Sequence, residues 1–489
     1  MKNFISMVSR SRMSLLGSVF ATAALVLFVV MFLMQLLGFE GGPYIGIITY
    51  LALPGLFLLG LLLIVMGLWR AKKRQARGEA EPPLPVIDFN KGATRKTLAT
   101  FGILGLVSVV LLSVGSFKAV HWMESVEFCG TTCHTVMQPE YTAYQRSPHS
   151  RVACADCHIG PGADWFVKSK ISGSWQLIAV TFDLYPTPIP TPVHNLRPAR
   201  ETCEQCHNPT KFSGDRLKVR AHFADDEKNT EMHNVLLVKV GGQHGRGSSG
   251  IHWHVDPNVS IRYLTDEKLE TVWDVEMTKN GEKTVFEAKD AAPSTAQWRT
   301  MDCVDCHNRP THIYRMPAGE IDAAMEQGLI DKGLPFVKRE GLRVVQADYP
   351  SHEAARAGIA REIAGFYAQN YPDAPKAAVE QAGRALGDIY SWNIFPAMKV
   401  TWGAYPNHIG HKESPGCFRC HDRKHKAESG AKISKDCDTC HTVLAEDEED
   451  PAILRQIAGE EPEQAASAAG GAASATTTQA SASTAAPTG

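Results

Sequence analysis

The chain has 489 residues, which is long enough for about three domains of ordinary size. Lysine and arginine total 50 against 52 acidic residues, so the formal net charge of -2 gives no reason to expect nucleic acid as a partner. A small secreted scaffold held by disulfides is excluded by length alone. Overall charge and length therefore do not identify a function, and the informative features are local. The first of these is the distribution of hydrophobic residues along the chain.

Three uncharged, mainly aliphatic stretches lie near the N-terminus, at about residues 15–38, 44–69 and 97–117. Each can cross a bilayer core of about 30 Å as a helix. The first is too long for the apolar core of a signal peptide and has no Ala-x-Ala-like cleavage site before Glu40. Pro54 and several glycines interrupt the second, which transmembrane helices tolerate. We predict a membrane region over residues 1–118 with three transmembrane helices.

Basic residues give this region an orientation. Lys2, Arg10 and Arg12 precede the first stretch, and residues 70–96 hold eight lysines and arginines against three acidic residues. Both segments should remain in the cytoplasm, because basic loops are retained inside. Three crossings then place everything after Lys118, including all twelve cysteines, outside the inner membrane in the bacterial periplasm.

The cysteines form six pairs, and a histidine directly follows each pair. The motifs are Cys129-x-x-x-Cys133-His134, Cys154-x-x-Cys157-His158, Cys203-x-x-Cys206-His207, Cys303-x-x-Cys306-His307, Cys417-x-x-Cys420-His421 and Cys437-x-x-Cys440-His441. Two thiols at this spacing add to the two vinyl groups of a haem, and the next residue places an imidazole on the iron. Zinc clusters and disulfides leave the repeated histidine unexplained. The pattern predicts six covalently bound haem c groups, with the six motif histidines as proximal iron ligands.

The motif spacing also bears on the fold. Six haems within about 320 residues should form much of the core, within a scaffold of short helices and loops. We therefore expect a mainly α and irregular multihaem cytochrome c, with three N-terminal transmembrane helices and a small β insertion in its periplasmic domain. Short separations, from Cys129 to Cys154 and from Cys417 to Cys437, suggest two closely packed haem pairs. The first motif has one extra residue between its cysteines, so its haem is expected to be attached or ligated unusually.

Further histidines lie close to the motifs and are candidates for the second iron ligand. An ordinary core or surface histidine is the alternative for each of them. The main candidates are His149, His194, His312, His408, His411 and His425. The secondary candidates are His121, His222, His233, His244, His252, His254 and His352. Ligation by two histidines would give low-potential irons with no open position, as in an electron relay.

Between the motifs the pattern changes, and we divide the chain accordingly. Residues 119–210 would carry haems 1–3, residues 211–300 a β-rich insertion, residues 301–445 haems 4–6, and residues 446–489 an acidic and then disordered Ala/Ser/Thr tail. The acidic run Glu446–Asp450 is expected to be solvated. Strands are predicted at Asn234–Val240, Val259–Leu264 and Leu269–Thr278, with a tight turn at Asn280-Gly281, and helices at Glu353–Gln369 and Pro375–Ile389.

Two local segments leave alternatives open. His252-Trp253-His254 reads as part of a strand whose histidines bind a metal or haem, or else face solvent. The segment Ala163–Phe182 carries apolar residues at helical spacing, with Lys168 and Lys170 near its start. It would either lie on the outer membrane surface or be buried as a soluble helix. On the membrane surface, it would form one wall of a pocket through which a lipid-soluble quinol reaches the first haem.

The residues around the first two motifs resemble the NapC/NirT family of membrane-anchored multihaem quinol dehydrogenases. The resemblance rests on Glu127-Phe128-Cys129, Cys133-His134-Thr-Val-Met137, Ser147-Pro148-His149 and Cys154-Ala-Asp-Cys157-His158. The resemblance covers about Thr97 to His207, which contains the first three motifs. The fourth motif, within Cys303 to His312, would bring the number of haems to the four that the family has. The C-terminal haems and extra N-terminal helices resemble the larger inner-membrane cytochromes of metal-reducing bacteria.

The resemblance implies roles for particular residues. In the family, a methionine just after the first motif binds iron; Met137 stands three residues after the motif histidine, one further than usual. Lys168 or Lys170 matches a lysine at the quinol pocket. Gln176 stands where relatives have an acid, which leaves Asp183 as a distant substitute.

The resulting hypothesis is an inner-membrane hexahaem cytochrome that oxidises menaquinol or a similar quinol and passes electrons to periplasmic multihaem cytochromes. This activity would serve anaerobic or extracellular respiration. One alternative is a membrane-tethered relay without its own quinol site. Another is a terminal nitrite-type reductase, which would need an iron with an open position.

Overall fold

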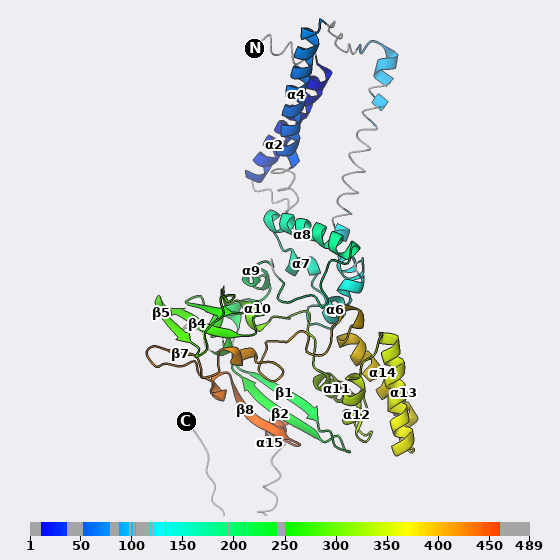
Figure 1. Ribbon diagram of the computed structural model, residues 1–489, viewed down its shortest axis with the longest axis vertical. Helices are drawn as coiled ribbons and strands as arrows, with labels where there is room; N and C mark the ends of the chain where they lie inside the picture. Colours follow the sequence, from blue (N-terminus) through cyan, green and yellow to red (C-terminus); the bar gives the residue numbers. More distant parts are fainter. Residues whose placement is uncertain are drawn as a thin grey trace, which may run out of the picture. The chain divides into compact units, whose positions relative to one another are not determined.

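The computed structural model describes residues 11–36, 52–78, 88–96, 99–100, 103, 118, 121–132, 134–193, 196–212, 214–241 and 250–459 (Figure 1). The chain divides into two compact units. The first unit comprises Met1–His207, Asp302–Ile313 and Ala397–Val400, and the second comprises Asn208–Met301, Tyr314–Pro396 and Thr401–Gly489. The motif at Cys303 therefore groups with the first three motifs, and the β-rich segment groups with the last two. The linear boundaries predicted from the sequence do not coincide with these units.

Among the described residues, two helices rather than three are long and apolar enough to cross a membrane: α2 (Arg12–Leu36) and α4 (Leu53–Ala76). The third predicted crossing, residues 97–117, lies outside the described residues except for positions 99, 100 and 103. Of the second predicted crossing, residues 44–51 lie outside the described residues, and Pro54 lies in the first described turn of α4. The C-terminal end of α4 carries the basic residues expected on the cytoplasmic side.

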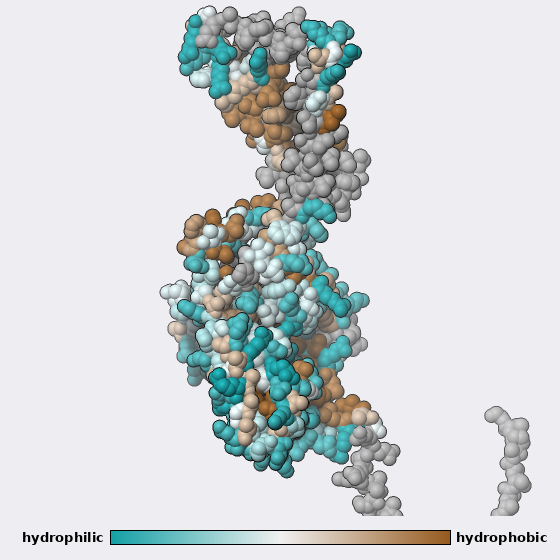
Figure 2. Space-filling view, turned by 90° about the vertical axis from the view of Figure 1, so that its right-hand side faces the viewer, coloured by the Kyte–Doolittle hydropathy of each residue, from teal (hydrophilic) through white to brown (hydrophobic). Residues whose placement is uncertain are grey.

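Small residues line the contact between α2 and α4. A Cβ atom added to Gly17 would lie 2.5 Å from the carbonyl oxygen of Gly60, so the two backbones touch at this point. The hydroxyl of Ser14, which is fully buried, donates to the carbonyl oxygen of Ile64 at 3.2 Å. Close backbone approach at small residues is the usual way in which membrane helices associate. Figure 2 shows hydrophobic surface over this helical pair.

Short helices carry the motifs of the first unit. They are η2 (Phe128–Thr132), α6 (His134–Gln145), α7 (Cys154–His158), α8 (Ala163–Thr181), α9 (Ala199–Cys203) and α10 (Cys303–Cys306). Asp302 joins two of them, because its carboxylate accepts from the backbone N–H of Cys303 at 2.6 Å and of Ala199 at 2.9 Å. The helix predicted at Ala163–Phe182 is confirmed as α8.

Two antiparallel sheets organise the second unit. The first sheet has the strand order β1-β2-β8 and consists of β1 (Arg216–Phe223), β2 (Glu231–Val238) and β8 (His441–Glu448). The second sheet has the strand order β6-β3-β4-β5-β7 and consists of β6 (Gln297–Thr300), β3 (Val259–Thr265), β4 (Val272–Lys279), β5 (Glu282–Glu287) and β7 (Lys426–Ala427). The predicted strands are confirmed, and the predicted turn has φ of +51° at Asn280 and +87° at Gly281. Because β7 and β8 come from the C-terminal haem region, the β-rich segment does not fold as a separate insertion.

One expectation for the second unit is wrong. His252-Trp253-His254 lies in the 3-10 helix η4 (Gly250–Val255) and not in a strand. The acidic run Glu446–Asp450 is exposed throughout, as expected. Its first three residues also belong to β8, which pairs with β2, and Asp447 lies 3.2 Å from the imidazole of His222.

Four helices of the second unit form a hydrophobic core of their own: α11 (Pro317–Glu326), α12 (Val337–Val345), α13 (His352–Asn370) and α14 (Lys376–Asn393). The remaining helices lie outside this core: α15 (Ala452–Ala458) and the short 3-10 helices η3 (Pro209–Lys211), η5 (Pro396–Met398), η6 (Gly416–Arg419) and η7 (Cys437–Thr439). Ile321, Ile359, Ile363 and Leu386 are fully buried in the core. The predicted helices at 353–369 and 375–389 are confirmed as α13 and α14. This core is built from side chains, so the expectation that porphyrins form most of the interior does not hold for α11–α14. The predicted tail beyond residue 459 lies outside the described residues.

Candidate haem sites

The first motif accommodates its extra residue in a π-helical turn, η2, which contains Cys129. Such turns insert one residue into a helix and recur at functional sites. Gly130 is buried in this turn, and a Cβ atom there would overlap the ring of Tyr141 from α6. The turn is therefore fixed by packing. Cys133 and the side chain of His134 lie outside the described residues.

Cysteines of successive motifs approach one another. The pKa of the Cys154 thiol is raised, first by a hydrogen bond with Cys129 and then by burial. The thiols of Cys203 and Cys303 also form a hydrogen bond. In the second unit, burial and then the neighbouring Cys417 raise the pKa of Cys440. The first motif thus contacts the second, and the third contacts the fourth. Cys157 of the second motif also lies near Cys203 of the third, and Cys417 of the fifth lies near Cys440 of the sixth. Cys157, Cys206, Cys306 and Cys437 are exposed, so an attached group has room beside them.

Four motif histidines in the described part of the chain each face a second histidine ring. The distances between ring centroids are 5.9 Å for His149 and His207, 6.2 Å for His158 and His312, 5.8 Å for His254 and His421, and 6.2 Å for His411 and His441. Two metal–nitrogen bonds of about 2.0 Å, plus about 1.1 Å from nitrogen to ring centre on each side, give about 6 Å. These rings are therefore spaced as an iron between two imidazoles requires, and the residues fit haem.

The same imidazoles are oriented by their other nitrogen. Metal-binding histidines usually donate the second ring N–H to a carbonyl or carboxylate, which fixes the tautomer and leaves Nε2 for the metal. Four Nδ1 atoms here lie near backbone carbonyl oxygens: His149 at 3.2 Å from Pro310, His312 at 3.0 Å from Glu140, His254 at 2.8 Å from Ile251, and His421 at 2.7 Å from Ser434.

Burial favours the neutral imidazole that a metal requires. It lowers the pKa of His158, and the nearby His312 lowers it further. Burial is also the main cause that lowers the pKa of His254 and that of His441. A neutral ring keeps a nitrogen lone pair available for iron.

Buried polar groups hold the two histidine-bearing loops of the first unit. Tyr144 of α6 donates its hydroxyl to the carbonyl oxygens of Ser150 and Val152, at 2.7 and 3.0 Å, and so holds the loop that carries His149. Arg309, which is 7 % exposed, lies 3.5 Å from the carboxylate of Glu140. The other carboxylate oxygen of Glu140 is 3.1 Å from Nδ1 of His312. The Glu140 carboxylate thereby connects α6 to the segment after the fourth motif.

The remaining predicted ligands occupy different settings. His194 lies outside the described residues. His408 is buried, and a Cβ atom added to Gly416 would lie 2.8 Å from the backbone carbonyl oxygen of His408. His425 is 1 % exposed, with Nδ1 2.9 Å from Asp422, and no ring contact with a motif histidine is seen for it in the described part of the chain. His307 ends α10, with its backbone N–H donating to Cys303 at 2.8 Å.

The two predicted lysines of the quinol pocket lie at the start of α8. The ammonium group of Lys168 lies 4.3 Å from the centre of the Trp165 ring, and that of Lys170 lies 4.7 Å from the Phe166 ring. Lys170 is also 3.8 Å from the carboxylate of Glu124. Sequence reasoning did not single out Glu124, because no sequence spacing connects residue 124 to residue 170.

The other residues implied by the resemblance are not gathered around this pair. Gln176 is exposed and donates to Ser172 of its own helix at 3.4 Å. Asp183 follows the end of α8 with φ of +53° and accepts a hydrogen bond from Tyr185. Met137 is half-buried in α6.

An open apolar surface adjoins the lysine and glutamate. On α8, Ile171 is 68 % exposed and Trp175 60 %, and Phe182 just beyond it is 68 % exposed. The structure of the described residues therefore does not bury this helix. Trp122 is exposed as well, and its ring packs on Phe128 at 4.6 Å, directly before Cys129.

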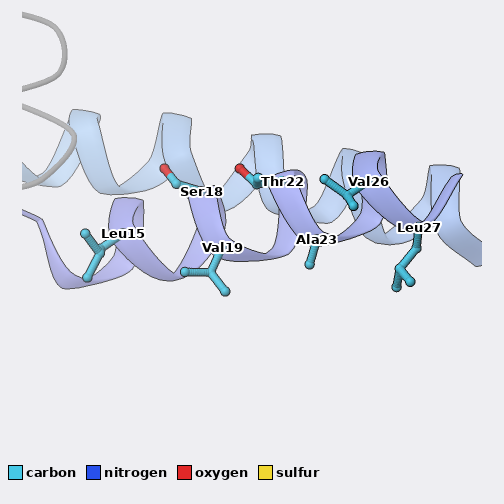
Figure 3. Close-up of a pocket in the computed structure, with 7 residues that line it drawn as sticks. All are labelled: Leu15, Ser18, Val19, Thr22, Ala23, Val26 and Leu27. Carbon is cyan, nitrogen blue, oxygen red and sulfur yellow. The ribbon is translucent and has the colours of Figure 1, made fainter. Parts of the chain in front are cut away.

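A groove along α2 has a different character (Figure 3). Its lining residues all belong to this one helix: Leu15, Ser18, Val19, Thr22, Ala23, Val26 and Leu27. None of these side chains can bind iron or accept the proton of a quinol. The groove is suited to lipid chains and is not a redox site.

Comparison with known proteins decides the family. The chain is 43 % identical over 446 residues to "Cytochrome c-type protein ImcH" of Geobacter sulfurreducens, and the alignment covers 88 % of each protein. Residues 91–235 match the family described as "NapC/NirT cytochrome c family, N-terminal region". The chain belongs to the NapC/NirT cytochrome c family. No solved structure matches it.

Membership confirms the resemblance predicted from the first motifs. The protein is a membrane-anchored c-type cytochrome that functions in electron transport. The family match ends within β2, so it contains the first three motifs but not the last three. The similarity to the Geobacter protein extends over most of the chain.

Proposed function

We propose that this cytochrome oxidises menaquinol or a similar quinol at the outer surface of the bacterial inner membrane. Electrons then pass through six haem c groups to periplasmic multihaem cytochromes. The observation that carries the proposal is the Lys170–Glu124 pair, which lies beside open apolar surface and close in sequence to the first motif.

The surroundings of this pair suit an amphipathic quinol. The ring and tail of a quinol need apolar contacts, which the exposed residues of α8 and Trp122 offer. Its hydroxyl groups need a hydrogen-bond donor and a proton acceptor, which Lys170 and Glu124 supply at a separation of 3.8 Å. Apolar residues exposed on α8 also favour its location in the membrane interface.

Haem would be held by the twelve motif cysteines, with the motif histidines as proximal ligands. We propose His149, His312 and His411 as distal ligands of the irons bound by His207, His158 and His441, since the rings face one another at 5.9–6.2 Å. Met137 is the proposed distal ligand at the first motif, from its position after His134. When bound, haem supplies one-electron acceptors at each motif.

The chain's own residues handle the protons. Oxidation of one quinol breaks two O–H bonds and yields the quinone, two electrons and two protons. The Glu124 carboxylate accepts one proton at a time and returns it to periplasmic water. The Lys170 ammonium orients the quinol oxygen and stabilises negative charge that develops there. The packing of Trp122 on Phe128, which directly precedes Cys129, supports a location of this chemistry near the first motif.

The pairwise meeting of motifs supports onward transfer. Electron tunnelling weakens steeply with distance, so neighbouring acceptors must lie close together. The hydrogen bonds of Cys129 with Cys154 and of Cys203 with Cys303, and the proximity of Cys417 to Cys440, bring proposed attachment points of neighbouring haems together. This arrangement supports a relay within each pair.

The test is anaerobic stopped-flow absorbance at the haem α-band, with oxidised protein in liposomes mixed with a reduced menaquinol analogue. We expect fast reduction of the parent, and reduction at least tenfold slower in Glu124→Gln and Lys170→Ala. Met137→Ala should slow the same phase. Lys376→Ala, on α14 of the second unit, is the matched control and should react like the parent.

Dithionite must still reduce all haems in every variant, which shows that the haems are intact. Full reduction by dithionite without reduction by quinol would reject the proposal and leave a tethered relay. Rapid reduction of Glu124→Gln would reject the proton-acceptor role alone.

A further inference from the structure

The second unit contains an imidazole pair that the motifs do not explain. The ring of His254 in η4 faces that of His421, the histidine of the fifth motif, with centroids 5.8 Å apart and planes at 75°. The structure assigns His254 as the distal iron ligand of the haem attached at Cys417 and Cys420. This assignment does not depend on quinol oxidation, because it concerns a different unit and a different haem.

The spacing of the two rings is the first argument. It equals the separation of the His149–His207 pair to within 0.1 Å, although one pair lies in each unit. Parallel stacking brings ring centres closer, as for His411 on Phe418 at 4.2 Å with planes at 12°. The 5.8 Å between His254 and His421 matches the gap of about 6 Å that two metal–nitrogen bonds require.

The tautomer is the second argument. Nδ1 of His254 donates to the carbonyl oxygen of Ile251 at 2.8 Å, and Nδ1 of His421 donates to that of Ser434 at 2.7 Å. Both rings therefore keep Nε2 for a metal, as ligating histidines normally do.

The rigidity of η4 is the third argument. The backbone N–H of Ile251 donates to the carbonyl oxygen of Lys239 at 2.8 Å, at the end of β2. Gly250 has φ of +67°, and a Cβ atom there would overlap the same Lys239 carbonyl. Nδ1 of His252 lies 3.0 Å from the carbonyl of Val240 and adds a second attachment. The β-rich segment thus presents His254 in a fixed position.

The ring planes predict a spectroscopic difference within the second unit. Perpendicular imidazoles leave two iron d orbitals nearly equal in energy, which gives low-spin iron with a very large maximum g value. Parallel imidazoles split these orbitals and give an ordinary rhombic signal. We expect the first type at the His254–His421 haem, with planes at 75°, and the second at the His411–His441 haem, with planes at 27°.

The experiment is low-temperature electron paramagnetic resonance of the air-oxidised, purified full-length protein. In His254→Ala, one of the six haems should change from low spin to high spin, and the large-g signal should lose one haem's intensity. His222→Ala is the matched control, because it removes a half-buried imidazole of the same unit that lies on β1, outside η4, and pairs with Asp447 at 3.2 Å. It should keep every haem low-spin.

A second variant distinguishes the loss of an iron ligand from misfolding of the protein. His254→Met replaces one ligand with another, so all haems should remain low-spin while one midpoint potential rises in a redox titration. The haem content by pyridine haemochrome should stay at the parent value in all three variants. Unchanged spectra in His254→Ala, or an equal high-spin signal in His222→Ala, would overturn the assignment.

Discussion

The two units position their proposed distal histidines in different ways. In the first unit, His149 and His312 lie five residues from a motif, yet each faces the histidine of a different motif. In the second unit, His411 precedes the fifth motif but faces His441 of the sixth, and His254 comes from a β-rich segment far away in sequence. Proximity to a motif therefore identifies a candidate ligand and does not identify its iron.

The units also differ in how the ligands are supported. Nδ1 of His149 and Nδ1 of His312 lie near the carbonyls of Pro310 and Glu140, each in a distant part of the chain. Nδ1 of His254 uses the carbonyl three residues before it. Ligand replacement in the first unit should therefore disturb the contact between motif segments, whereas replacement in the second should stay local.

The strongest test of this difference is His312→Ala. We expect one high-spin haem, quinol-driven reduction of later haems slowed at least tenfold, and a loss of about 2 kcal/mol in unfolding free energy, because the contacts to Glu140 disappear as well. Unfolding followed at the haem Soret band measures this loss. His254→Ala should cost clearly less stability. Equal losses would remove the distinction between the units.

A smaller effect is expected for the ion pair that braces the first unit. Glu140→Gln leaves the Arg309 guanidinium, 7 % exposed, without its carboxylate at 3.5 Å. Since Glu140 itself is partly exposed, we expect a loss of about 2 kcal/mol or less, below the range for a fully buried pair. Chemical unfolding of Glu140→Gln beside Glu362→Gln, which breaks an exposed pair in the second unit, provides the comparison. A loss no greater than in Glu362→Gln would contradict the bracing role.

The packed π-turn offers a third test. In Gly130→Ala the new methyl group meets the Tyr141 ring, and we expect about 1–2 kcal/mol of destabilisation with a shifted potential of the first haem only. Spectroelectrochemical titration measures the potential. Adding Tyr141→Leu should restore it, because the ring is the obstacle. A shift that survives the second substitution would point to backbone strain instead.

The smallest effect should arise at Phe418, which lies within the fifth motif. Phe418 stacks on His411 at 4.2 Å, with the ammonium of Lys435 4.3 Å from the same phenyl ring. Phe418→Leu should cost less than about 1.5 kcal/mol and leave every haem low-spin, since it removes support and not a ligand. Electron paramagnetic resonance and thermal unfolding check both parts. A high-spin signal would show that the stack is needed to hold His411.

These comparisons show which features of the fold and of the candidate sites can be predicted from the sequence. Two cysteines and a histidine within one helical turn specify haem attachment locally, and Asn280-Gly281 specifies a turn by φ alone. His254 depends on η4 being held to the end of β2, and the Glu124–Lys170 pair depends on how the segment before the first motif meets α8. Such pairings arise from tertiary contacts, so no spacing rule predicts them. The reading of His252 to His254 as a strand failed because alternation over three residues cannot distinguish a strand from a 3-10 turn.

The backbone contact between α2 and α4 has an energetic consequence for the cell. The two helices touch at Gly17 and Gly60, and residues 1–120 contain neither cysteine nor histidine, so this pair has neither the space nor the attachment motif for a haem c inside the bilayer. Electrons taken from a quinol at the outer surface would leave on the side where its protons are released. The step would then move no net charge across the membrane and add nothing directly to the proton-motive force. Energy conservation would fall to the enzymes that reduce the quinone pool.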